Sequence, residues 1–226
     1  MNESENVHAS VIGMTVDYLT RYVMGADPEK AFKVSLAGAS KAEHMHSQKN
    51  ALETARMLLS GIKDMNEQSI VNACKLVSYD VWARNPREAT RSKGPDKIDP
   101  DQETIQNIKI MVDRSVEFWK SYGSIVKDGF DFKPNGYTRT VDRGDGDYLT
   151  ADTIWDFKVS KTKPNKMHTL QLLMYWIMGQ HSGQGVFKTI HNIGIFNPRS
   201  NEVYLYDTNN LPKEIVGIIK NEIICY

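Results

Sequence analysis

Hydrophobic and polar positions follow two different rhythms along the chain. Up to Gly123, apolar residues recur every three or four positions, which is typical of helices that bury one face. After Gly123, apolar and polar residues alternate in several short runs, which is typical of strands. The pattern therefore predicts a helical first half followed by a region that contains a β-sheet.

The clearest helix lies in the segment "DPDQETIQNIKIMVDRSVEFWKSYG". Asp99 is expected to cap this helix, Pro100 to start it and Gly123 to end it. Its apolar positions form one stripe at helical spacing, made of Ile105, Ile108, Val112, Val116 and Trp119. This stripe predicts a face packed into a core and not a cofactor-binding surface.

Earlier helices have their own start signals. Asp27 and Pro28 predict a cap and a first helical position, and the helical pattern continues through "ALETARMLLSGI" with an interruption near Gly38. Asp64 and Glu67 have the spacing of a capping box at the start of another helix. The segment "WARNPREATRSKGPDKIDP" loses this periodicity. Its three prolines and five basic residues predict a connector, with a substrate-facing flap as the alternative.

The second half is expected to contain three consecutive strands in "GYTRTVD", "DGDYLT" and "TIWDFKV". A helix in "MHTLQLLMYWIMGQH" follows, then two strands in "IHNIGIFN" and "NEVYLYD" around the turn "PRS", and a closing helix from about Pro212. The order β-β-β-α-β-β-α predicts an α/β fold. We expect a single domain over 1–226, with a helical portion over 1–125 and an α/β core over 130–226.

Composition narrows the classes of protein that remain. The formal net charge is zero, so no global basic field indicates a nucleic-acid partner, although a local patch would suffice for binding. Cys74 and Cys225 cannot supply the four thiolates of an iron–sulfur cluster or of an all-cysteine zinc site, and a reduced protein is favoured over one with a disulfide. The start "MNESENVHAS" lacks the features of a signal peptide, and no apolar run is long enough to span a bilayer. These features predict a cytoplasmic protein without a membrane partner.

Carboxylates stand out in the predicted strands. In "TIWDFKV", Asp156 and Lys158 share one face, whereas Trp155 and Phe157 lie on the other, which is expected to be core. A tight hairpin centred on Ala151-Asp152 would place Leu149 opposite Ile154, and Asp147 opposite Asp156. A loop of odd length would shift the register by one residue and turn Asp147 away.

Two carboxylates side by side repel each other unless a cation lies between them. Mg²⁺ suits such a place because it binds one or two carboxylates and keeps several waters. Lys158 could then position or deprotonate a water, or stabilise negative charge that develops on a phosphate. The alternative is a surface hairpin in which an Asp–Lys ion pair needs no metal.

Two features after the strand bear on this choice. Lys161, Lys163 and Lys166 form a local basic edge suited to phosphates, although a solvated loop would have the same composition. Gln171 and Tyr175 are four residues apart and therefore share a helix face. A glutamine among apolar neighbours needs a partner or a function, unless it lies at the helix edge beside a half-buried tyrosine.

Together these residues resemble the PD-(D/E)XK nuclease superfamily, and within it the RecB-like branch. That branch is marked by a G-x-x-D strand, a D-x-K strand and a Q-x-x-x-Y helix. Here the three motifs correspond to Gly144 and Asp147, to Asp156 and Lys158, and to Gln171 and Tyr175. The similarity covers roughly residues 136–180, and it implies a restriction-endonuclease-like mixed β-sheet core flanked by helices.

The resemblance also implies roles for these residues. Asp147 and Asp156 would bind Mg²⁺ or Mn²⁺, with the carbonyl of Phe157 as a further candidate ligand. Lys158 would serve the attacking water, and Gln171 and Tyr175 would hold the site and the DNA strand. Lys161, Lys163 and Lys166 would bind substrate. No iron–sulfur cluster is expected, because the chain lacks the four cysteines that some RecB-like relatives use.

Some ligand assignments stay open. The gap between Asp147 and Asp156 is short for the family, so Asp145 or Asp142 could be the ligand in place of Asp147. Family members often add an acid or a histidine from an upstream helix. The segment "KAEHMHSQ" offers three candidates for that position, namely Glu43, His44 and His46.

The predicted function is a Mg²⁺- or Mn²⁺-dependent deoxyribonuclease. An exonuclease-type activity is favoured because RecB-like members commonly degrade ends. One alternative is a catalytically silent DNA-binding or assembly module of the same fold, and another is a hydrolase of a small phosphate ester. Because the chain is neutral, a homo-oligomer or a partner protein could supply the basic surface that DNA binding needs.

Overall fold

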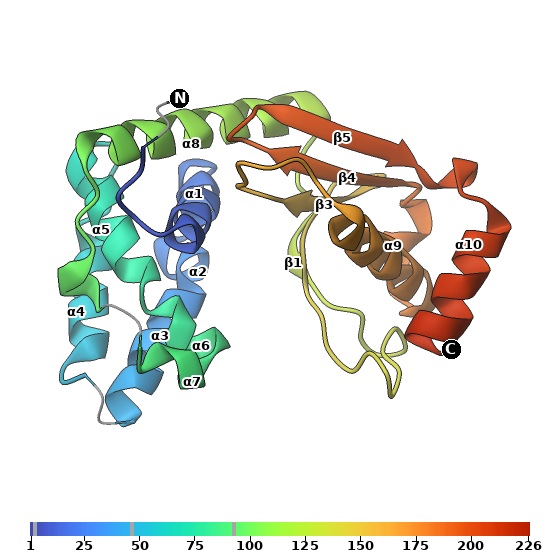
Figure 1. Ribbon diagram of the computed structural model, residues 1–226, viewed down its shortest axis with the longest axis horizontal. Coiled ribbons are helices and arrows are strands. Elements are labelled where there is room, and N and C mark those ends of the chain that lie inside the picture. The colour runs from blue at the N-terminus through green and yellow to red at the C-terminus, as the bar shows by residue number, and fades with distance from the viewer. Residues whose placement is uncertain (2–3, 46–47, 92–93) are drawn as a thin grey trace. The chain divides into compact units, whose positions relative to one another are not determined.

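The computed structural model describes residues 1, 4–45, 48–91 and 94–226, and it has a mixed α/β fold (Figure 1). The chain forms two compact units, Met1–Glu117 and Phe118–Tyr226. The boundary between the units falls inside helix α8, which runs from Gln102 to Tyr122. None of the described helices is both long enough and apolar enough to cross a membrane.

The first unit is helical, as its sequence period predicts. Its elements before α8 are α1 (Ala9–Val23), α2 (Pro28–Ala31), α3 (Lys33–His44), α4 (Ala51–Ser60), α5 (Glu67–Val77), α6 (Asp80–Arg84), α7 (Pro86–Ala89) and the 3-10 turn η1 (Pro95–Lys97). The start signal at Asp27 and Pro28 is confirmed, because the Asp27 carboxylate accepts a hydrogen bond from the amide of Lys30 at 3.1 Å.

The predicted interruption near Gly38 is wrong, since Gly38 lies inside α3. A Cβ at this position would meet the carbonyl oxygen of Tyr79 at 2.0 Å, so glycine is needed there for the close approach of two backbones. The helix instead ends at His44, and α4 begins at Ala51. Gly38 therefore allows another segment to pack closely against α3 and does not interrupt the helix.

Two predicted caps lie two residues too early in the sequence. Helix α5 is capped by Asn66, whose side chain accepts from the amide of Ser69 at 2.9 Å, and not by Asp64. At α8 the capping carboxylate is that of Asp101, which accepts from the amide of Thr104 at 2.8 Å. Asp99 stays outside the helix, and its carbonyl accepts from the side chain of Asn6. The predicted end of α8 at Gly123 is confirmed by its left-handed φ of 103°.

The segment predicted as an irregular connector contains short helices. It includes most of α6, all of α7 and the turn η1, and both Trp82 and Ala89 are buried. The prolines begin two of these elements, at Pro86 and Pro95, where a missing amide hydrogen costs no helical bond. The prediction mistook start signals for breaks.

The second unit follows the predicted order of elements. After the end of α8 come β1 (Lys127–Phe130), β2 (Gly146–Leu149), β3 (Thr153–Phe157), α9 (Lys166–His181), η2 (Gly185–Thr189), β4 (Asn192–Asn197), β5 (Glu202–Asp207), η3 (Thr208–Asn210), α10 (Lys213–Ile218) and the π-helical η4 (Ile219–Ile224). The strands form one sheet in the order β1-β2-β3-β4-β5, with β3 and β4 parallel and the other neighbours antiparallel. A mixed sheet with flanking helices is therefore confirmed.

The position predicted for the first strand is wrong. "GYTRTVD" is a loop, and β1 lies upstream at Lys127–Phe130. Polar groups of the loop bond outside any sheet: the hydroxyl of Thr138 donates to the carbonyl of Ile224, and the hydroxyl of Tyr226 donates to the carbonyl of Gly136, both at 2.5 Å. These bonds tie the β1–β2 loop to the end of the chain.

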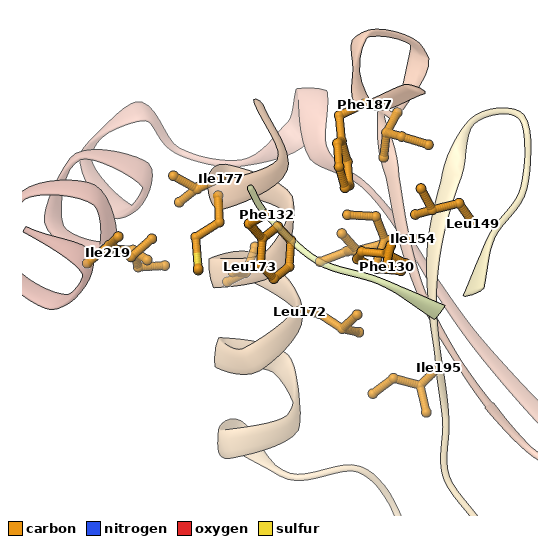
Figure 2. Packing of buried hydrophobic residues seen from close by; sticks show 14 residues of the cluster. Phe130, Phe132, Leu149, Ile154, Leu172, Leu173, Ile177, Phe187, Ile195 and Ile219 are labelled. Atoms are coloured by element: carbon orange, nitrogen blue, oxygen red, sulfur yellow. The ribbon is translucent and has the colours of Figure 1, made fainter. Parts of the chain in front are cut away.

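Apolar clusters cover both faces of the sheet. On one face Leu149 and Ile154 pack with side chains of α9 and with Phe187, and Figure 2 shows Leu172 lying between α9 and the strand of Ile195. The other face carries the second cluster, made of Phe118, Trp119, Tyr148, Trp155 and Phe196. The sequence pattern predicts one core face and one face for chemistry. The polar site instead lies at the end of a strand whose two faces are both buried.

Candidate functional site

The hairpin between β2 and β3 has the predicted register. Leu149 pairs with Ile154, and the amide of Thr150 donates to the carbonyl of Thr153 at 3.0 Å across the two-residue turn. Continuing this register places Asp147 opposite Asp156. A carboxylate oxygen of Asp147 accepts from the amide of Phe157 at 2.9 Å, which holds Asp147 against β3 next to Asp156.

Asp156 is a buried carboxylate in which only one of the two oxygens is paired with a described residue. Its side chain is 7% exposed, and its Oδ1 lies 3.0 Å from the Nζ of Lys158. Within the described part of the chain, its Oδ2 is buried and has no hydrogen-bond partner. Burial raises the pKa of Asp156, while the charges of Lys158 and His168 oppose this rise. We call Asp147, Asp156 and Lys158 the carboxylate site.

The position of this site follows from the sheet topology. Strands β3 and β4 are parallel, and their pairing continues beyond β3, where the amide of Lys158 donates to the carbonyl of Phe196 at 3.0 Å. Asp156 and Lys158 therefore lie at the carboxyl end of a parallel pair, the edge at which open α/β sheets commonly bind ligands. Asn197 orders the chain after this point by donating to the carbonyl of Ser160 at 2.8 Å.

Helix α9 brings a polar pair to the same neighbourhood. The side-chain amide of Gln171 donates to the hydroxyl of Tyr175 at 2.9 Å, so these two predicted partners do meet. Burial raises the pKa of Tyr175, and the nearby carboxylates of Asp145, Asp147 and Asp156 raise it further. The tyrosine hydroxyl thus lies within the electrostatic field of the carboxylate site.

The other predicted residues lie at the surface. Lys161, Lys163 and Lys166 are exposed in the segment between β3 and the first turn of α9. Asp145 is exposed just before β2, where its charge reaches Tyr175, and Asp142 is exposed farther back in the loop. Of the two alternatives to Asp147, Asp145 is therefore the one whose charge acts on a residue beside the site.

The two upstream candidates that the structure describes, Glu43 and His44, belong to the first unit. The carboxylate of Glu43 accepts from the amide of Leu52 at 2.9 Å, and Nδ1 of His44 lies 2.6 Å from the carbonyl oxygen of Ser40. Both contacts are local ones near the end of α3. His46 lies outside the described residues.

A divalent cation is compatible with the carboxylate site. Among the described residues no three His, Cys, Asp or Glu side chains come together as a metal-binding group. Mg²⁺ does not require such a cluster, because it commonly uses one or two carboxylates and retains waters. The unpartnered Oδ2 of Asp156 is the observation that fits a cation, since a buried carboxylate oxygen without a donor is unfavourable.

Sequence reasoning missed His168. This residue lies in the first turn of α9, within electrostatic range of Asp156. Two signals could have found it: Asn165 and His168 have capping-box spacing, and His168 precedes Gln171 by three residues and Tyr175 by seven. His168 therefore extends the Gln171–Tyr175 face toward the start of the helix.

No family model, no curated protein and no solved structure matches this chain. The resemblance to the RecB-like nucleases consequently stays a prediction that is carried by the motifs.

Proposed function

We propose that this protein is a metal-dependent nuclease that hydrolyses phosphodiester bonds in DNA at the carboxylate site. The observation that carries this proposal is the environment of Asp156. This buried carboxylate lies 3.0 Å from the amine of Lys158 and directly precedes Phe157, whose amide donates to Asp147, and one of its oxygens has no donor among the described residues. Such an oxygen is accounted for if it binds a cation.

Asp147 and Asp156 would hold Mg²⁺ or Mn²⁺, with the Phe157 carbonyl as a further candidate ligand. When bound, the cation supplies positive charge that stabilises the negative charge developing on the phosphate. The carboxylates fix its position, because Asp147 is tied to the Phe157 amide and Asp156 is buried in the sheet. Both ligands are thus held before substrate arrives, which lowers the entropy cost of assembling the site.

Lys158 and α9 would act on the reacting groups themselves. The Lys158 side chain is 29% exposed, and its amine can donate to the attacking water or to a phosphate oxygen. Tyr175, restrained by its hydrogen bond from Gln171, would orient the substrate strand beside the carboxylates. Lys161, Lys163 and Lys166 would contribute phosphate contacts along the exposed segment after β3.

A catalytically silent DNA-binding or assembly module is the second candidate. The observation that favours it is the formal net charge of zero, because a nuclease acting alone must hold DNA with its own basic surface. An oligomer or a partner protein that completes such a surface would reconcile this neutrality with catalysis. The exonuclease-type action that the resemblance implies is part of the nuclease proposal and not of this second candidate.

Degradation of linear duplex, circular duplex and single-stranded DNA tests the proposal directly. Each substrate is incubated with Mg²⁺, with Mn²⁺ or with EDTA. Wild type is compared with Lys158→Ala and, as a matched control, with Lys213→Ala, an exposed lysine in α10. We expect metal-dependent loss of linear DNA that is abolished in Lys158→Ala and unchanged in Lys213→Ala. Equal behaviour of all three proteins on every substrate would contradict the proposed site.

A further inference from the structure

The first turn of α9 is closed by a capping box in which a histidine occupies the place usually taken by Glu or Gln. The side-chain oxygen of Asn165 accepts from the amides of Met167 and His168, at 2.9 and 3.3 Å. In return, the amide of Asn165 donates to Nδ1 of His168 at 3.3 Å. Because these amides are already paired, the end of the helix itself offers them to no anion.

This contact determines which ring nitrogen of His168 carries hydrogen. Nδ1 accepts a hydrogen bond, so it has a free lone pair, and in the neutral ring the hydrogen is on Nε2. Nε2 is thus a donor. Coordination of a metal through Nε2 would require the hydrogen on Nδ1, where it would face the amide hydrogen of Asn165. The geometry therefore favours a hydrogen-bond donor over a metal ligand.

His168 lies on the side of α9 that belongs to the candidate site. Residues 168, 171 and 175 share one helix face, and helix α9 packs against β3 and β4. At the far end of this row, Tyr175 experiences the charges of Asp147 and Asp156, and at the near end His168 lies within electrostatic range of Asp156. A half-buried donor is thus placed on the same helix face as Gln171 and Tyr175, in the turn that Lys166 begins.

We infer that His168 is a substrate-contacting residue, which donates its Nε2 hydrogen to a phosphate oxygen of the nucleic-acid strand held at the carboxylate site. This inference rests on the proposed function, because it assigns to that site a contact with its phosphodiester substrate. The contact is a hydrogen bond only, and no bond to His168 forms or breaks. This donor would complement Lys161, Lys163 and Lys166. Because the amide of Asn165 holds the imidazole ring in place, its Nε2 hydrogen would be directed at one phosphate oxygen.

Two substitutions separate substrate contact from helix capping. Both His168→Gln and His168→Glu keep an acceptor for the amide of Asn165, because Gln and Glu are the usual residues at this capping position. Glutamine also keeps a donor, whereas glutamate presents a negative charge to the phosphate. Met167→Glu is the control, since it adds the same charge at an exposed neighbouring residue.

Two further variants distinguish the loss of a substrate contact from the loss of stability. His168→Met removes both the cap acceptor and the donor, whereas Asn165→Ala removes the cap and leaves His168 in place. If His168 acts only as a cap, the two variants should lose stability and activity together. If it contacts substrate, His168→Met should lose activity well beyond Asn165→Ala at equal stability.

The measurements are kcat/KM on fluorescein-labelled linear duplex DNA with Mg²⁺, binding of the same DNA in Ca²⁺, and melting temperature. We expect His168→Glu to lose about 10- to 100-fold in kcat/KM, the range of a hydrogen bond to a charged group. His168→Gln and Met167→Glu should stay within a few-fold of wild type, and His168→Met should fall below Asn165→Ala.

The outcomes distinguish this inference from the proposed function. An active wild type with equal activity in His168→Glu and His168→Gln, or in His168→Met and Asn165→Ala, would overturn the inference and leave the nuclease proposal intact. A wild type that binds DNA without cleaving it, with binding weakened in His168→Glu alone, would support the phosphate contact and refute hydrolysis. A wild type that neither cleaves nor binds would overturn both.

Discussion

Each unit of the chain buries an aspartate, and the two carboxylates have opposite environments. In the first unit Asp80 is fully buried, and both of its oxygens accept hydrogen bonds, one from Ser35 and one from Tyr18, each at 2.5 Å. Arg84 lies 3.6 Å from the same carboxylate. In the second unit Asp156 has Lys158 on one oxygen and, among the described residues, no donor on the other.

The difference separates a structural carboxylate from a candidate ligand. Burial raises the pKa of both groups, so a raised pKa does not distinguish them. The number of hydrogen-bond donors around each carboxylate does distinguish them. Asp80 joins α1, α3 and α6, and each of its oxygens accepts a hydrogen bond, whereas one oxygen of Asp156 has no donor among the residues that the structure describes.

Asp80→Ala should cause a larger loss of stability than any substitution of Asp156. The change leaves the hydroxyls of Ser35 and Tyr18 without their acceptor and removes the charged partner at 3.6 Å from Arg84. Each buried hydroxyl that is left without its acceptor costs about 1–3 kcal/mol, and the pair with Arg84 adds little because that side chain is 55% exposed. Urea unfolding at neutral pH measures the loss, with Asp113→Ala at an exposed position of α8 as the control. A loss equal to that of the control would show that the Asp80 network stabilises nothing.

Metal should stabilise the protein through Asp156 and not through Asp80. A cation that binds the folded state raises the free energy of unfolding by about 2.7 kcal/mol at 100 times its Kd. We expect Mn²⁺ to raise the melting temperature of wild type and not that of Asp156→Ala, with Mg²⁺ acting in the same direction. An equal rise in both proteins would place the cation elsewhere in the chain.

The pH dependence of stability tests the buried state of Asp80. Burial raises the pKa of Asp80 in the folded protein, so the folded state binds the proton more tightly than the unfolded state does. The stability linked to this group is therefore present below the ordinary carboxyl pKa, and it is lost as the pH rises through the folded pKa. Each unit of the shift corresponds to about 1.4 kcal/mol.

The matched comparison is wild type against Asp80→Asn, which cannot ionise. Urea unfolding from pH 4 to pH 8 should show the free energy of unfolding of wild type falling relative to that of the variant. A constant difference between the two proteins would mean that Asp80 does not titrate differently in the folded state.

The smallest effect is expected for Asp156→Asn without metal. The substitution keeps the shape of the side chain, and the Lys158 side chain that loses its charged partner is 29% exposed to solvent, so the stability should stay within about 1 kcal/mol of wild type. The same change is expected to abolish stabilisation by Mn²⁺. Thermal melts in EDTA and in Mn²⁺ measure both effects. A large loss in EDTA would make Asp156 a structural residue like Asp80.

The sequence predicted the register of the β2–β3 hairpin, with Leu149 opposite Ile154, because that register depends on local rules. Side chains alternate along a strand, and a two-residue turn at Ala151-Asp152 fixes which residues lie opposite each other. The same rules failed for "GYTRTVD", where alternation is present but the polar groups bond to Ile224 and Tyr226 from the other end of the unit. Alternation alone cannot reveal partners that distant in sequence.

The amino-acid sequence by itself determined the helical first half, the order of the later elements and the residues of the three motifs, because these follow from periodicity and spacing. Tertiary structure decided the rest. It alone buried both faces of β3, satisfied the carboxylate of Asp80 and left an oxygen of Asp156 without a donor among the residues that the structure describes. The physical reason is that burial and hydrogen-bond satisfaction depend on residues brought together from distant parts of the chain, which no local pattern records.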